Sequence, residues 1–157
     1  MKNCALVIVD VQNDFCAGGA LAVPDGDAIV PVLNRYIAIF KSKGCPVFST
    51  RDWHPVKTVH FRTFGGRWPP HCVRNTKGAE FHPLLKLPQD AVIITKGVDP
   101  DEDSYSGFDG RDPEGRPLAA SLQALGVTRI FVGGLATDYC VRATVLDAIK
   151  NRFEAAV

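Results

Sequence analysis

The chain has 157 residues, of which 46% are hydrophobic and 22% are charged, and its formal net charge at pH 7 is +1. A chain of this length and composition is typical of one globular domain with a hydrophobic core. The near-neutral charge gives no electrostatic footprint for nucleic acid or for an anionic membrane, so we expect a small-molecule ligand.

Five cysteines are scattered along the sequence without a paired CxxC spacing, which argues against a disulfide framework and against a thiolate zinc site. They are Cys4, Cys16, Cys45, Cys72 and Cys140. The first residues run directly into a short apolar stretch that ends at Asp10. This pattern is typical neither of a signal peptide nor of a membrane span. We therefore expect a cytoplasmic protein in a reducing compartment.

Four apolar runs are predicted to form strands, and periodic stretches between them are predicted to form helices. The runs are residues 5–9, 46–50, 91–95 and 129–132. The first run is continuous and rich in β-branched residues, which is typical of a strand buried on both faces of a parallel sheet. Apolar residues recur at helical spacing over residues 29–40, 117–125 and 141–150. Asp27 is expected to cap the first helix and Gly44 to end it.

This alternation predicts an α/β fold, an open parallel sheet with helices on both faces. No repeat, low-complexity tract or linker divides the sequence, so we expect a single domain over residues 1–157. Within it, residues 55–88 are rich in Pro, Gly, His and aromatic residues and show little periodicity. So long an irregular segment is usually functional, and we interpret it as an inserted loop that binds metal and substrate.

A polar or reactive residue closes each predicted strand or the turn that follows it. These residues are Asp10, Asp52, Lys96 and Cys140. Because the carboxyl ends of parallel strands meet at one edge of the sheet, we expect the four side chains to converge. Each one alone has a simpler structural explanation, such as a packed thiol or a solvated lysine, and their joint placement is what favours a site.

The converging residues are the parts of an acyl-transfer site. Asp10 supplies a base that can take the proton of the Cys140 thiol. Cys140 is expected in the first turn of a helix, and both Lys96 and the positive end of that helix are expected to favour the thiolate. The backbone N–H groups of Ala136 and Cys140 are candidate donors for an oxyanion hole.

A second group of residues suits a metal ion. Asp52 and His54 point to the same side of an extended chain, and His60 and His71 follow in the irregular segment. Carboxylate oxygen and imidazole nitrogen suit Zn²⁺, Mn²⁺ or Fe²⁺, so these four residues are the candidate ligands. Surface histidines in a polar loop would explain the spacing equally well. His82 lies outside this group and is interpreted as structural.

Two aromatic residues, Phe15 and Trp68, lie in loops and not in periodic runs. Loops at the strand ends would form the wall of a pocket, and a flat aromatic substrate between the two rings would explain both positions. Packing in the core is the alternative for either residue.

Together these motifs resemble the nicotinamidases of the isochorismatase-like cysteine hydrolases. The matching stretches, in the order of that family and spread over nearly the whole chain, are residues 9–15, 50–55, 60–61, 68–72, 95–97 and 133–141. Within the superfamily, the Asp-x-His and Trp-Pro-x-His pair is specific to nicotinamidases. The resemblance implies an isochorismatase-like, Rossmann-type three-layer sandwich.

The resemblance also implies a reaction. Cys140 would attack the carboxamide carbon of nicotinamide, with Asp10 as general acid and base and Lys96 as the electrostatic partner. Ammonia would leave, and water would hydrolyse the nicotinoyl thioester to nicotinate, which serves salvage toward NAD. Pyrazinamide would be an analogue substrate.

In similar enzymes one divalent ion is bound by the residues that match Asp52, His54 and His71, and in some also by the match of His60. The resemblance therefore implies such an ion here, with Zn²⁺ preferred to Fe²⁺ or Mn²⁺. The pyridine nitrogen of the substrate would lie at that ion.

The resemblance implies two further features of the pocket. The substrate ring would lie between Phe15 and Trp68. A cis peptide before Ala136 would shape the oxyanion hole.

One departure concerns the end of the sequence. Relatives continue past the helix that follows Cys140 into another strand and a last helix, whereas this sequence stops at residues 153–157, where that strand should begin. We therefore expect the fold to lack its last strand and helix. An uncovered sheet edge favours low stability or association, including a homo-oligomer.

Two other functions stay open on the sequence. A different amidase of the superfamily, acting on carbamoyl or ureido substrates, would keep the aspartate, lysine and cysteine but lack the metal motif. A non-catalytic binding module stabilised by zinc would use the histidines structurally and pack Cys140 in its core.

Overall fold

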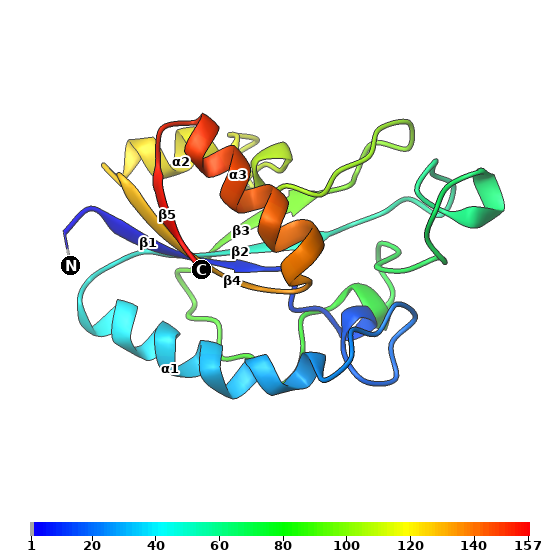
Figure 1. Cartoon of the computed structure of the whole chain (residues 1–157), viewed down its shortest axis with the longest axis horizontal. Helices are drawn as coiled ribbons and strands as arrows, with labels where there is room; N and C mark the ends of the chain where they lie inside the picture. The colour runs from blue at the N-terminus through cyan, green and yellow to red at the C-terminus, as the bar shows by residue number, and fades with distance from the viewer. Residues whose placement is uncertain (1) are drawn as a thin grey trace.

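The structure, a computed structural model, describes residues 2–157 and contains a five-stranded parallel sheet (Figure 1). The strands lie in the spatial order β3-β2-β1-β4-β5. Their bounds are β1 Cys4–Val9, β2 Val47–Asp52, β3 Val92–Lys96, β4 Arg129–Gly134 and β5 Glu154–Ala156. The first four confirm the strands predicted from the apolar runs.

β5 occupies the position at which the sequence analysis places the start of a further strand. It pairs with β4 from Arg129↔Glu154 to Phe131↔Ala156, and Phe153 just before it is buried. That strand is therefore formed over three residues, and no helix follows it within the described chain.

Three α-helices cover the two faces of the sheet, as expected. They are α1 Ile29–Ser42, α2 Leu118–Ala124 and α3 Arg142–Lys150. Figure 1 shows α1 below the sheet and α2 with α3 above it. Each helix buries one apolar stripe against the strands, so the molecule has three layers.

β1 forms the centre of both hydrophobic layers. Its residues Ala5, Val7 and Val9 pack on the side of α2 and α3, whereas Leu6 and Ile8 pack against α1. Alternate residues of a strand point to opposite faces, so a strand covered on both sides must be apolar throughout. This is why the continuous run in the sequence predicts a central parallel strand.

The ends of α1 confirm one sequence prediction and correct another. Gly44 has φ +67, and the Cys45 N–H donates to the Phe40 carbonyl at 3.0 Å, which is the left-handed ending expected of a glycine. Asp27 does not cap the helix, because a 3-10 turn over Gly26–Ala28 comes before it. The Asp27 carboxylate instead accepts the Ala17 N–H at 3.2 Å.

The strand order creates a crevice at one end of the sheet. The chain moves from β1 to β2 and β3 on one side, and then returns to place β4 on the other side of β1. The connections that leave the carboxyl ends of β1 and β4 therefore diverge, which is where open parallel sheets bind ligands. The loops gather at this end in Figure 1.

The irregular segment between β2 and β3 is anchored by a buried glutamine. The Gln12 Nε2 donates to the carbonyls of Asp52 and Ala79, both at 2.8 Å, and its Oε1 accepts the Asp52 N–H at 2.8 Å. All the hydrogen-bonding groups of a buried amide need partners, and here they fasten the loop to β2. Contacts with residues distant in sequence therefore hold this segment in place. The segment has no periodic pattern from which these contacts could be predicted.

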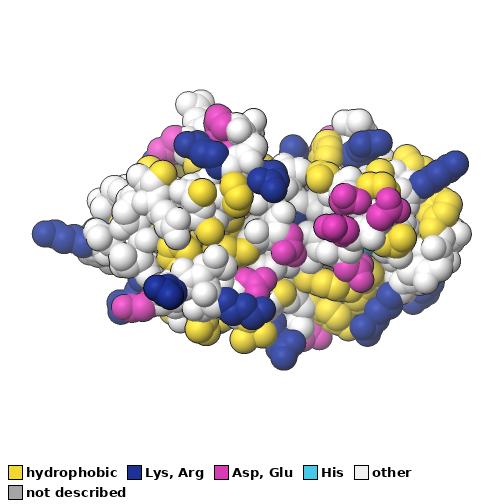
Figure 2. All heavy atoms as spheres, turned by 90° about the horizontal axis from the view of Figure 1, so that it is seen from above, with side chains coloured by type: hydrophobic (Ala, Val, Ile, Leu, Met, Phe, Trp, Pro, Cys, Tyr) yellow, Lys and Arg dark blue, Asp and Glu magenta, His cyan; other side chains and the backbone are white. Residues whose placement is uncertain are grey.

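The surface agrees with the near-neutral charge of the sequence. On the face seen in Figure 2, basic side chains are scattered and acidic ones gather near one part of it, with no continuous basic area of the kind that nucleic acid requires. None of the five cysteines forms a disulfide, which agrees with their spacing, and all five are buried. No helix among residues 2–157 is both long and apolar enough to cross a membrane.

The two leucines near the end of α2 test the packing of this layer. Leu122 is 0% exposed and Leu125 is 56% exposed. We expect Leu122→Ala to lower the free energy of unfolding by about 2–5 kcal/mol, because it leaves a cavity under the helix. Leu125→Ala should change it by less than about 0.5 kcal/mol. Urea unfolding followed by circular dichroism measures both, and equal losses would contradict the assigned packing.

Candidate active site

A cavity of about 240 Å³ opens at the carboxyl ends of the strands. The site residues predicted from the sequence that line it are Phe15, Asp52, His54, His60, Trp68, His71, Ala136 and Cys140. Asp10 and Lys96 lie beneath its floor, with exposed fractions of 0% and 1%. A cavity of this size can hold a small ligand such as a single ring with a small substituent.

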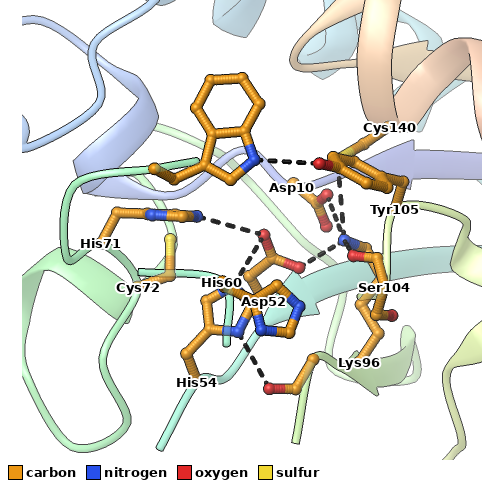
Figure 3. Close-up of polar contacts among 12 residues, drawn as sticks. Asp10, Asp52, His54, His60, His71, Cys72, Lys96, Ser104, Tyr105 and Cys140 are labelled. Atoms are coloured by element: carbon orange, nitrogen blue, oxygen red, sulfur yellow. Dashed lines mark hydrogen bonds and ion pairs between the residues drawn. The ribbon is translucent and has the colours of Figure 1, made fainter. Parts of the chain in front are cut away.

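A buried ammonium group connects the predicted catalytic residues (Figure 3). The Lys96 Nζ donates to Asp52 Oδ1, lies 3.0 Å from Asp10 Oδ2 and approaches Cys140 Sγ to 3.7 Å. Lys96 ends β3 and Asp52 ends the neighbouring β2, at paired positions in the sheet. The convergence expected at the strand ends is therefore present.

Asp10 keeps one carboxylate oxygen available. Its Oδ1 accepts the Thr50 hydroxyl at 2.6 Å. Its Oδ2 is in ion-pair range of Lys96 but has no partner in hydrogen-bonding geometry, although it is fully buried. The carboxylates of Asp10 and Asp52 and the Cys140 sulfur lie within 4.8 Å of one another. A buried acceptor without a hydrogen bond beside a thiol is placed to receive its proton.

Burial decides the protonation state of these groups. It raises the pKa of the Cys140 thiol well above its usual value, and the Lys96 ammonium only partly opposes this. Burial likewise raises the pKa of Asp10, against the effect of Lys96. Lys96 does favour the thiolate, as expected, but desolvation of the buried sulfur has the larger and opposite effect on the pKa of the thiol. Cys140 needs an adjacent base, and Asp10 has a carboxylate oxygen without a hydrogen bond for this role.

The other two charges of the cluster stabilise each other. Burial alone would lower the pKa of Lys96, but the carboxylates of Asp10 and Asp52 raise it well above its usual value. Burial would raise the pKa of Asp52, but Lys96 and His54 lower it below the usual range. Lys96 is therefore an ammonium ion and Asp52 a carboxylate.

The turn that carries Cys140 is tightly packed against β1. Gly134 has φ +146, and a Cβ at this position would lie 2.1 Å from the Val9 carbonyl oxygen, so only glycine fits. The peptide between Leu135 and Ala136 is cis, as the resemblance implies. Cys140 then lies in a π-helical turn, Thr137–Val141, that runs directly into α3. The sequence places it in the first turn of a helix, and the structure places it just before.

Asp52, His54 and His71 form a group suited to one divalent ion. Their ligand atoms lie within 4.8 Å of one another, with Asp52 Oδ2 at 3.5 Å from His54 Nε2 and 4.0 Å from His71 Nε2. The Nδ1 atoms of the two histidines lie 3.0 Å and 2.8 Å from backbone carbonyl oxygens. A carbonyl can only accept, so each Nδ1 carries the proton and each Nε2 offers a lone pair. The donor set therefore fits a divalent ion.

His60 lies beside this group but not within it. Its Nδ1 is 2.5 Å from the Thr58 hydroxyl oxygen, and that hydroxyl donates to the Pro100 carbonyl. The Nε2 is again left as an acceptor, and it is buried without a hydrogen-bond partner. Its ring centroid is 4.5 Å from that of His54. The structure thus brings three of the four predicted ligands together.

Two other groups of ligand-type side chains do not suit a metal ion. Asp10, Asp52 and Cys140 already surround the Lys96 ammonium, which occupies the position of a cation. In the group of Cys16, Asp27 and His82, the Nδ1 of His82 accepts the Leu84 N–H at 3.2 Å. The Nε2 of His82 therefore carries the proton and faces Asp27 at 3.3 Å, which is the wrong tautomer for a metal ligand.

Aromatic rings line much of the cavity. The Phe15 ring lies 5.5 Å from that of His71. The Trp68 Nε1 donates to the Tyr105 hydroxyl at 3.0 Å, and the Trp68 ring meets that of Tyr139 edge-on at 5.1 Å. Phe15 and Trp68 were expected from the sequence. Tyr105 and Tyr139 were missed, although both lie in turns that follow predicted strands.

The loop after β1 supplies the rest of the wall. Its residues 21–24 line the cavity, and none of them has a chemical group that would mark it in the sequence. Leu21 and Val23 pack against Phe15 and the segment around Cys72. These apolar side chains make their part of the cavity wall apolar.

Comparison with known proteins agrees with this geometry. The sequence profile of the isochorismatase domain matches residues 4–157. The chain belongs to the isochorismatase family. It is 43% identical to the nicotinamidase of Escherichia coli, over all of this chain and 81% of that protein. The family named from the sequence motifs is thus confirmed.

Two solved structures are similar over most of their length. The pyrazinamidase of Pyrococcus horikoshii in complex with zinc is 53% identical, with a TM-score of 0.89 over 96% of this chain and 80% of that one. The PnC1 protein of L. infantum in complex with nicotinate is 40% identical, with a TM-score of 0.84 over 96% and 76%. The expected isochorismatase-like fold is therefore confirmed.

The histidine tautomers provide a test of the metal centre. We expect His71→Ala to weaken Zn²⁺ binding by more than the roughly 10-fold to 100-fold that loss of an outer-shell partner costs, since it removes one of three ligands. His82→Ala should leave the affinity unchanged. Competition with a chromophoric chelator measures both. Equal weakening by the two variants would argue against the assigned ligands.

Proposed function

We propose that this protein is a metal-dependent cysteine amidohydrolase that converts nicotinamide to nicotinate and ammonia, with pyrazinamide as an analogue substrate. One observation carries the proposal. Cys140, which lies beside a buried base, and the three residues of the metal group line the same small cavity, whose walls are aromatic. Relatives named nicotinamidase and pyrazinamidase, and structures solved with zinc and with nicotinate, support the same reaction.

The substrate fits between the two halves of the site. Its ring lies between Phe15 and Trp68, which both line the cavity. Asp52, His54 and His71 would hold one divalent ion, with Zn²⁺ preferred, and that ion would supply a Lewis acid for the pyridine nitrogen. This orientation directs the carboxamide toward Cys140.

The first half of the reaction forms a thioester. The Cys140 sulfur attacks the carboxamide carbon while its proton passes to Asp10 Oδ2, which has no other hydrogen bond. Backbone N–H groups of Ala136 and Cys140 stabilise the oxyanion. Asp10 then returns the proton to the nitrogen, the carbon–nitrogen bond breaks and ammonia leaves.

The second half regenerates the thiol. Asp10 takes a proton from water, whose oxygen attacks the thioester carbon, and the carbon–sulfur bond breaks. The proton on Asp10 returns to Cys140, and nicotinate leaves. Lys96 remains an ammonium ion throughout and stabilises the Asp10 carboxylate each time it forms.

The two alternatives explain less of the structure. A carbamoyl or ureido amidase has no use for a metal group in the cavity that holds the nucleophile. A non-catalytic module has no use for a buried thiol beside an ion pair, since burying those charges is costly.

The direct test is release of ammonia from nicotinamide by the purified protein. We expect activity that falls on chelation, returns with Zn²⁺ and drops by more than about 10³-fold in Cys140→Ala, because the covalent route is lost. Cys4→Ala, at the opposite end of β1, is the matched control and should retain full activity. Absence of ammonia from folded, zinc-loaded protein would refute the proposal.

The role of Asp10 has its own signature. We expect Asp10→Asn to lower kcat by about 10²-fold to 10⁴-fold, the usual contribution of a general acid or base, with a small change in KM. Steady-state kinetics on nicotinamide measure both constants. A variant that keeps its kcat would show that another group accepts the Cys140 proton.

A further inference from the structure

One carboxylate outside the catalytic cluster joins the cavity wall to the metal-ligand segment. Asp14 Oδ2 accepts the Cys72 N–H at 2.7 Å, and Cys72 directly follows the ligand His71. Its Oδ1 accepts the Ala20 N–H at 3.1 Å, from the loop that continues into the cavity wall. Both are hydrogen bonds to a charged acceptor, which is the stronger class.

The backbone at Cys72 needs this support. Cys72 has φ +44, a left-handed conformation that costs energy for a residue with a side chain. Its N–H is held by Asp14, and its carbonyl accepts the His54 N–H at 3.0 Å. The peptide units around Cys72 therefore connect two metal ligands, His54 and His71, and Asp14 fixes one end of that connection.

The carboxylate itself has little freedom to move. A Cβ on Gly78 would lie 2.1 Å from Asp14 Oδ2, so the carboxylate lies directly against the backbone of that glycine. The turn around Gly78 is fastened in place, because the Asn13 Nδ2 donates to the Lys77 carbonyl at 2.8 Å and Gln12 donates to that of Ala79. Asp14 is thus positioned from both sides.

We propose that Asp14 is a positioning residue that sets the metal affinity of the site by fixing the turn after His71. The inference rests on the proposed metal-dependent function. The same carboxylate holds the loop that forms the apolar wall, so Asp14 also couples the metal group to the pocket that receives the substrate ring.

Asp27 provides a matched control on the same loop. Its carboxylate accepts the Ala17 N–H at 3.2 Å and faces His82, and none of the contacts described for it reaches the segment of His71 and Cys72. Loss of Asp27 would loosen the loop without touching the metal ligands. A general effect of loop disorder would therefore appear in both variants, whereas positioning of the ligands would appear only for Asp14.

The experiment is a Zn²⁺ titration of metal-free full-length protein against a chromophoric chelator. We expect Asp14→Asn to weaken Zn²⁺ binding about 10-fold to 100-fold, because an amide cannot accept both N–H groups and its NH₂ would oppose one of them. Asp27→Asn should stay within about 2-fold of the unmodified protein. Gly78→Ala should weaken binding like Asp14→Asn, since its new Cβ displaces the carboxylate.

Circular dichroism in excess chelator shows whether each variant is folded. If Asp14→Asn does not fold, the Zn²⁺ affinity of Gly78→Ala tests the role of Asp14 in its place. Unchanged affinity in the folded variants would overturn the inference and leave the metal site intact. Equal weakening by Asp14→Asn and Asp27→Asn would assign the effect to the loop and also overturn it. Failure of the unmodified protein to bind Zn²⁺ would instead overturn the proposed metal-dependent function, on which the inference rests.

Discussion

The site depends on one buried ammonium group shared by two carboxylates. Lys96 is 1% exposed, and it contacts Asp10 on one side and Asp52 on the other. Removing one partner of a buried ion pair leaves an uncompensated charge and lowers the free energy of unfolding by about 3–5 kcal/mol. Each of the three residues therefore depends on the other two. The sheet makes the arrangement possible, because β3, β2 and β1 deliver the three side chains to the same edge.

Asp52 connects the two chemical halves of the cavity. One of its oxygens accepts from Lys96 and the other faces the two histidines of the metal group. Lys96 in turn approaches the Cys140 sulfur. A change of charge at the metal group therefore changes the electrostatic potential at the Cys140 sulfur, through one carboxylate and one ammonium group. Such interactions are weakly screened in the protein interior.

Local patterns in the sequence account for most of the fold. Continuous apolar runs predict the first four strands, and helical spacing predicts all three helices, because burial on one or two faces imposes a period on the chain. The cap predicted at Asp27 is wrong, since an extra 3-10 turn moves the start of α1 beyond it. In that turn the Asp27 carboxylate contacts residues 17 and 82, and the pairing with residue 82 is distant in sequence.

The sequence by itself determined the first four strands, the family and the residue types that carry the chemistry. The tertiary structure alone decided how those residues act. Cys140 is a thiol because packing desolvates it, which outweighs the nearby Lys96. The tautomers of His54 and His71 follow from carbonyls 43 and 2 residues away in sequence. Protonation and ligand geometry depend on neighbours brought by folding, and spacing along the chain does not encode them.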